Sequence, residues 1–167
     1  DIEEDKIPAN FTTFYLNNSD DEEIEKANIK INNKILHQSK LINYLKPEKS
    51  NKDPTKDINA FLKKIKKNKK YFFSKKDVIL VEAFKSDGIK ILEKYNDLYQ
   101  INDSEIPSDI QIFVNSGDMA AALLRIVEVI GQDNLNNIDE DTLYFIISTL
   151  NQLNADPLRN RILFKVL

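Results

Sequence analysis

The stretch SGDMAAALLRIVEVIG, residues 116–131, decides the fold of this chain. Between its first and last glycines lie only three charged side chains, and two of them, Arg125 and Glu128, are three residues apart and share one narrow side of a helix. A helix that is apolar on nearly every side is usually surrounded by other helices. We therefore expect residues 119–130 to form the most buried helix of a layered helical array.

Stop and start signals divide the chain into further helices. Gly117 suits the left-handed residue that ends one helix, and Asp118 suits the N-cap of the next. Ser74, with Asp77 three residues later, has the pattern of a capping box, and Asp139 precedes a clean helical stripe of apolar residues. These signals predict helices at residues 19–45, 54–65, 74–88, 89–99, 107–114, 139–153 and 156–167.

The fold class follows from this succession of helices. No segment alternates apolar and polar residues between hairpin turns, and the chain has only 3 glycines, so we predict an all-α protein. The helix pairs at 107–131 and 139–167 suggest a repeat length near that of tetratricopeptide proteins, although the consensus of that repeat is absent. We expect one domain, residues 1–167, of stacked helix-turn-helix pairs that form a short α-solenoid or an irregular helical bundle.

The ends and one internal segment differ from the rest in composition. Residues 46–56 hold two prolines and many charges, which predicts a mobile loop. The chain begins at Asp1 rather than Met, and it ends on apolar residues without a helix cap. We therefore expect it to be a fragment of a longer chain, and the oligomeric state stays open.

Composition removes several classes of function. Hydrophobic residues make up 41% and charged residues 31% of the chain, as in ordinary water-soluble proteins, and the net charge of -3 does not favour binding of nucleic acid by the whole molecule. The absence of cysteine excludes disulfides, thiolate metal sites and a cysteine nucleophile. No stretch is long enough to span a membrane, and we find no N-terminal signal sequence, so we expect a soluble protein of the cytoplasm or the periplasm.

Residues 116–167 also carry a family resemblance. Their short Gly-Asp helix start, Ala/Leu-rich helix, acidic cap and closing basic–apolar helix are similar to the C-terminal part of uncharacterised helical-repeat proteins of alphaproteobacteria, of the tetratricopeptide or HEAT kind. The resemblance implies an α-solenoid and a longer parent chain. It implies no catalytic residues.

A basic run is the first candidate site. Its lysines are interleaved with aromatic residues between positions 61 and 76, and such a mixture is typical of surfaces that hold single-stranded nucleic acid. The alternative is a solvated helix end whose aromatic side chains belong to the core. The candidate polyanion patch comprises Lys63, Lys64, Lys66, Lys67, Lys69, Lys70, Tyr71, Lys75 and Lys76.

A second candidate lies in the last helix, where Arg159, Arg161 and Lys165 are placed to grip an acidic partner. The alternative is surface charge, with one arginine paired back to Glu128 or Asp139.

Catalytic and metal-binding patterns are weak throughout. His37 is the only histidine, and Ser39, two residues away, does not share its side of a helix. The acids at 139–141 lack the spacing of a calcium loop and fit a helix start. We find no phosphate loop, dinucleotide fingerprint or nucleophile elbow, so the sequence predicts no metal, no cofactor and no enzyme.

Two hypotheses of function remain. The first is a non-enzymatic scaffold or adaptor that binds another protein, because helical repeats present extended surfaces. The second is binding of single-stranded nucleic acid or another polyanion through residues 61–76.

Overall fold

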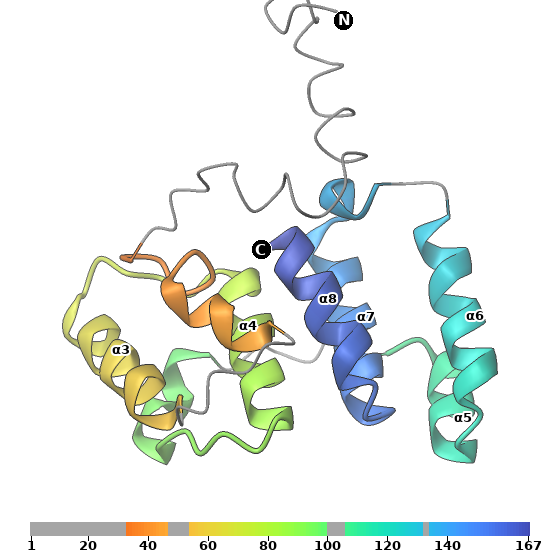
Figure 1. The fold of residues 1–167 in the computed structure, drawn as a ribbon, viewed down its shortest axis with the longest axis horizontal. Helices are drawn as coiled ribbons and strands as arrows, with labels where there is room; N and C mark the ends of the chain where they lie inside the picture. The colour runs from red at the N-terminus through yellow and green to blue at the C-terminus, as the bar shows by residue number, and fades with distance from the viewer. Residues whose placement is uncertain (1–32, 47–53, 100–105, 132–133) are drawn as a thin grey trace, which may run out of the picture. The chain divides into compact units, whose positions relative to one another are not determined.

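The computed structural model describes residues 33–46, 54–99, 106–131 and 134–167, which all belong to one compact unit beginning at Asn32 (Figure 1). Every regular element in these ranges is a helix, which confirms the all-α class. Among the described helices, none combines the length and the apolar character needed to cross a bilayer.

The elements, with η for a 3-10 helix, are η2 (Lys40–Leu45), α3 (Thr55–Lys67), α4 (Lys75–Ser86), η3 (Glu93–Leu98), α5 (Ser108–Ser116), α6 (Met119–Ile130), η4 (Leu135–Asn137), α7 (Glu140–Gln152) and α8 (Asp156–Val166).

The core lies where α4, α7 and α8 meet. Helix α4 packs along α7, and α8 contacts both (Figure 1). Their apolar residues recur at helical spacing and exclude water almost completely, which supplies most of the hydrophobic stabilisation of the unit. The fully buried members are Leu80, Val81, Ala83 and Phe84 of α4, Leu143, Ile146 and Leu150 of α7, and Leu163 of α8.

Local capping fixes where these helices begin. The Ser74 side chain accepts a hydrogen bond from the Asp77 amide, and the Asp77 carboxylate accepts one from the Ser74 amide, so the predicted capping box is present. Asp139 accepts hydrogen bonds from the amides of Asp141 and Thr142 at the start of α7. These caps satisfy amides that have no partner inside the helix.

The predicted helix over residues 19–45 is wrong in its described part. Residues 33–39 form turns, and only η2 follows them. The His37 amide bonds to the Asp77 carboxylate, and the Ser39 hydroxyl donates to the carbonyl of Leu36 and accepts from the amide of Leu41. One distant bond, to Asp77, and two local bonds of Ser39 therefore take the place of the helical hydrogen bonds here.

The prediction for residues 119–130 is also wrong in its burial. They do form α6, with Asp118 as N-cap and with Gly117 left-handed (φ 71°) at the end of α5. Yet only Ala122 and Ile126 of α6 are buried. Helix α6 packs on α5, which in turn contacts α7, so α6 is an outer helix rather than the central one.

The predicted mobile loop cannot be compared in full, because its residues 47–53 lie outside the described ranges. The described ends of the segment belong to helices, because Lys46 is the C-cap of η2 and α3 begins at Thr55.

Candidate functional site

One side of α6 carries apolar residues that nothing in the described ranges covers. Ala120, Leu124 and Val127, which we call the α6 stripe, are spaced by four and three residues and therefore lie in one row along the helix. Leu124 is 67% exposed and Val127 is 62% exposed. Side chains of this size are usually buried, so the row is a candidate contact surface.

The α6 stripe is uncovered because α6 packs on α5 through its opposite side. Ala122 and Ile126, the latter 4% exposed, occupy the side that packs on α5. Helix α6 is thus apolar on two sides, and α5 covers only one of them. The exposed sides of the two helices add further apolar area, from Ile112 of α5 and from Met119 and Val129 of α6.

A polar cluster borders the α6 stripe. The Arg125 Nε donates to a carboxylate oxygen of Asp109 at 2.8 Å, and an Arg125 terminal nitrogen donates to Glu128 at 2.9 Å. Arg125 lowers the pKa of Asp109, and the two carboxylates together raise the pKa of Arg125. The cluster ties α6 to α5 and keeps charge at the edge of the apolar row.

The predicted polyanion patch is only partly assembled. Lys66 donates to the carbonyl of Lys94, Lys75 forms an ion pair with Asp141, and Lys76 donates to the carbonyl of Val166. The remaining lysines are exposed, and among the described residues their ammonium groups have no ion partner; they are Lys63, Lys64, Lys67, Lys69 and Lys70.

The aromatic residues of the run divide in the same way. Tyr71 is held inward, because its hydroxyl donates to Asp77 and accepts from the Leu36 amide. Burial, with the nearby Asp77 carboxylate, raises the pKa of Tyr71. Phe73 packs edge-on against Tyr71. Phe72, 85% exposed, is the most accessible aromatic side chain of the run, and a role of Tyr71 in a binding patch stays a prediction.

The candidate acidic-partner contacts are separated by the fold. Arg159 is 0% exposed and bonds to Asp87 at 2.5 Å and to Asp156 at 2.7 Å, so it cannot grip another protein, and its prediction is wrong. The partners are also neither of the two acids expected from the sequence. Arg161 and Lys165 are exposed, and their role stays a prediction.

A buried network surrounds the only histidine. The Asp77 carboxylate, 1% exposed, accepts hydrogen bonds from the His37 amide at 2.9 Å, from His37 Nδ1 at 2.7 Å and from Tyr71 at 2.9 Å. Burial alone would raise the pKa of Asp77, but the hydrogen bonds from His37, Ser74 and Tyr71 outweigh it and lower the pKa. The network joins residues 36–37 to the start of α4.

The order of atoms in this network does not match a nucleophilic triad. In a triad the carboxylate and the serine bind opposite nitrogens of the imidazole. Here Ser74 Oγ lies 3.4 Å from His37 Nδ1, the same nitrogen that Asp77 binds. Ser39, whose hydroxyl is committed to the carbonyl of Leu36, is 2% exposed. The network therefore fits a structural role, which holds two segments together.

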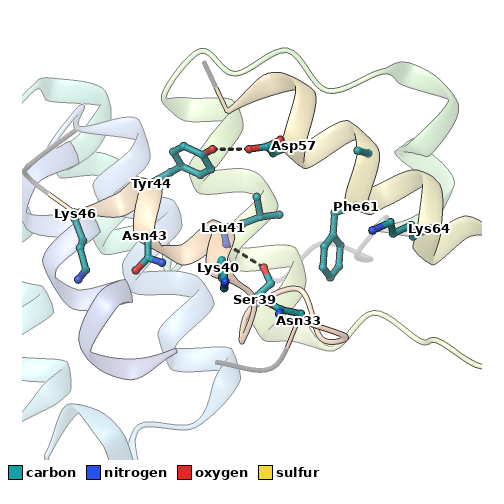
Figure 2. A pocket seen from close by; sticks show the side chains of 11 residues that line it. Asn33, Ser39, Lys40, Leu41, Asn43, Tyr44, Lys46, Asp57, Phe61 and Lys64 are labelled. Carbon is teal, nitrogen blue, oxygen red and sulfur yellow. Dashed lines mark hydrogen bonds between the residues drawn. The ribbon is translucent and has the colours of Figure 1, made fainter. Parts of the chain in front are cut away.

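An open groove of about 810 Å³ separates η2 from α3 (Figure 2). Lys40 approaches it from the start of η2, Lys46 from the C-cap of η2 and Lys64 from α3. The Tyr44 hydroxyl donates to Asp57 at 2.7 Å across it. Positive charge therefore exceeds negative charge among its lining residues.

Two of the acidic residues at 139–141, Asp139 and Asp141, make contacts that stabilise the fold. Asp139 caps α7, and hydrogen bonds from the Thr142 amide and hydroxyl lower the pKa of Asp139. Asp141 pairs with Lys75. Within the ranges that the structure describes, no group of three or more metal-ligating side chains comes together.

Comparison with known proteins adds no relative. The chain matches no protein-family model, and it has no significant match among curated proteins or solved structures. The resemblance to helical-repeat proteins therefore stays a prediction.

Sequence reasoning missed two features. The spacing of Leu124 and Val127 showed an apolar row, but nothing in the sequence showed that no helix covers it. The Asp77–His37 pair joins residues 40 positions apart, and its only local signal was the capping box of Ser74 and Asp77.

Proposed function

We propose that this chain is a non-enzymatic scaffold or adaptor that binds a protein partner on the α6 stripe. The observation that carries the proposal is the exposure of Leu124 and Val127 on a helix capped at both ends. Complete burial of such a side chain contributes roughly 1.5–3 kcal/mol, so covering both would supply much of the free energy of a moderate complex.

The form of the stripe favours a helical partner. Residues spaced by four and three positions make a straight ridge, which fits the groove between ridges of another helix. Charge stays at the border, on Arg125 and Glu128, as in a contact with an apolar centre and a polar rim.

A solenoid arrangement is the second part of the proposal. Helices α5 and α6 are joined by two residues and α7 and α8 by three, and α5 packs against α7. These contacts are compatible with one helix pair stacked on another. The terminal pair of such a stack presents its outer side to a further layer, and α6 has this outer position.

Catalysis has no part in the proposal. The only histidine has its carboxylate and its nearest serine on one nitrogen, so it lacks a nucleophile placed for proton transfer through the other.

A photo-crosslinking experiment tests the docking surface. A photoreactive residue at position 124, introduced into cells that make the chain naturally, should capture one main protein, whereas the same residue at position 92 should not. Leu92 is a matched control because it is also an exposed leucine. The captured protein, purified and titrated, should bind the wild type and Leu92→Glu equally and lose binding to Leu124→Glu. Equal binding to all three would refute the proposal.

A second candidate function is binding of single-stranded nucleic acid or another polyanion. Exposed lysines of the basic run lie next to exposed Phe72, and Lys64 also lines the groove of Figure 2. Binding of a single-stranded RNA at low salt, abolished by changing Lys63, Lys67, Lys69 and Lys70 to Glu but not by Lys165→Glu, would favour it. A steep loss of affinity with added salt should accompany such binding.

A further inference from the structure

We propose that the loop between α3 and α4, residues 68–74, binds the surface of an anionic membrane, with nearby lysines on the headgroups and the ring of Phe72 inserted between them. The inference rests on the second candidate function, since it names the polyanion that the basic run binds, and it does not depend on the α6 stripe. Figure 1 shows the loop at the outer edge of the fold, between the end of α3 and the start of α4.

The charge around this loop is of one sign. From residue 58 to residue 76 the chain has eight lysines and no acidic residue. On α3, Lys63 and Lys67 lie opposite the buried Ile58 and Ile65, because successive residues of a helix turn by about 100°. Both lysines are exposed, and neither has an ion partner among the described residues. The outer side of α3 therefore leads a row of positive charge toward the loop.

The loop adds two exposed lysines and an exposed aromatic side chain. Lys69 and Lys70 precede Phe72, which is 85% exposed. A phenylalanine ring of this exposure gains free energy when an apolar phase covers it. The boundary of an anionic bilayer matches both features, because its headgroups attract the lysines and its acyl chains receive the ring. The aliphatic stems of the lysines can lie along the same boundary.

The contacts of the other aromatic residues favour a membrane over single-stranded nucleic acid. Binding of successive bases uses several accessible rings. The Tyr71 hydroxyl is bonded to Asp77, and Phe73 packs against Tyr71 and Tyr99, so Phe72 is placed as a single inserting side chain. The run also contains no arginine, whose planar fork fits individual phosphates, whereas the point charge of lysine suits a diffuse anionic surface.

The net charge of the whole chain does not oppose this contact. It is -3, so acidic residues outnumber basic ones elsewhere in the chain. Charges are screened over roughly 8 Å at physiological ionic strength, so a membrane at the loop interacts mainly with the lysines beside it. The insertion is shallow, because backbone amides of a loop keep their water at the headgroup level.

Sedimentation of the chain with lipid vesicles tests the inference. We expect binding to phosphatidylcholine vesicles that contain about a quarter phosphatidylserine, and none to pure phosphatidylcholine. Changing Lys69 and Lys70 together to Gln should weaken binding roughly thirtyfold, since each lysine near such a surface contributes roughly fivefold.

A matched control removes the same charge at the other end of α3. Lys56 lies in the first turn of α3, and the carbonyl of Lys90 accepts a hydrogen bond from Asn59 of that helix. Both lysines are exposed, and changing them together to Gln should weaken binding by less than about threefold. Equal losses in the two double variants, or no binding to the anionic vesicles, would overturn the inference.

Insertion of residue 72 can be measured directly. The chain has no tryptophan, so Phe72→Trp places a single fluorophore in the loop. On anionic vesicles its emission should shift to shorter wavelength and be quenched by brominated acyl chains. Leu124→Trp, at an exposed position of α6, is the control, and its emission should stay unchanged. An unchanged emission at position 72 in the bound protein would show that the ring does not insert, and the inference would fail.

Titration with a single-stranded RNA at low salt separates this inference from the second candidate function. Binding of anionic vesicles without binding of RNA supports the membrane as the polyanion. Binding of RNA without vesicles overturns the inference and leaves the second candidate function standing, and if neither binds, both fail. If both bind, the inference stands only when the emission of Phe72→Trp shifts on vesicles.

Discussion

The buried guanidinium of Arg159 links the three helices of the core through its hydrogen bonds. It bonds to Asp87 at the end of α4, to Asn151 of α7 and to Asp156 of its own helix. It therefore joins the three helices of the core at one point. A charge so deeply buried is tolerated only because several acceptors surround it.

Removal of this side chain should strongly destabilise the protein. We expect Arg159→Ala to lower the free energy of unfolding by roughly 3 kcal/mol, because it leaves part-buried acceptors unpaired and opens a cavity. Arg161→Ala, two residues away and exposed, is the matched control and should change it by less than about 0.5 kcal/mol. Urea denaturation of both variants measures the difference, and similar losses would contradict the assigned contacts.

Asp77 makes the stability of the fold depend on pH in the acidic range. Its pKa is lower in the folded chain than its ordinary value of 3.8, since hydrogen bonds from His37, Ser74 and Tyr71 favour the carboxylate despite its burial. A lowered folded-state pKa contributes stability that is complete above the unfolded-state pKa and is lost as the pH falls through the folded-state value. The contribution of Asp77 should therefore be lost only below about pH 4.

Asp77→Asn tests this dependence. At neutral pH we expect the variant to lose roughly 2–3 kcal/mol of unfolding free energy, because an amide supplies a donor where the site needs an acceptor. Below pH 4 the difference from the wild type should shrink. Asp97→Asn, an exposed aspartate, is the control. Denaturation at a series of pH values makes the measurement, and a constant difference across the series would show that ionisation of Asp77 is not the cause.

At the scale of elements, α6 shows that an apolar helix need not be a central one. Two of its sides are apolar, but α5 covers only the side of Ala122 and Ile126. The uncovered side then carries the proposed interaction, so the same helix serves both the fold and the contact surface.

The two sides of α6 should respond differently to substitution. Ile126→Ala removes buried methyl groups and should cost roughly 2–5 kcal/mol of unfolding free energy. Leu124→Ala, on the exposed side, should cost less than about 1 kcal/mol. Thermal or urea denaturation of the purified chain makes the comparison. The reverse order of losses would mean that α6 is turned the other way round.

At the scale of the whole molecule, the helices should differ in how readily they open. Helices α4 and α7 have more buried residues than the other described helices. Helix α6 has only two, both on the side that packs on α5. Local opening costs least where few apolar contacts are broken.

Amide hydrogen exchange should reveal this order. In the purified chain we expect the slowest exchange in α4 and α7 and faster exchange in α6. When a partner covers the α6 stripe, protection should rise in α6 more than in α3, which lies outside the proposed contact. Exchange in α6 as slow as in α7 in the purified chain would contradict the outer position of α6.

Features that depend on contacts between nearby residues were predicted from the sequence, whereas features that depend on distant contacts were not. The helix at 119–130, its Asp118 cap, the Gly117 turn and the capping box of Ser74 and Asp77 were all predicted, because each depends on residues within about four positions of one another. Such signals act before any tertiary contact forms, so the sequence alone determined the all-α class and most helix boundaries.

Tertiary structure decided the rest. Arg159 meets Asp87 across 72 positions and His37 meets Asp77 across 40, and neither pairing has a signal in the intervening residues. The periodicity of α6 marks its apolar sides but not which of them another helix covers, because coverage depends on how separate elements pack. The exposed α6 stripe, on which the proposed function rests, is therefore a property of the folded chain.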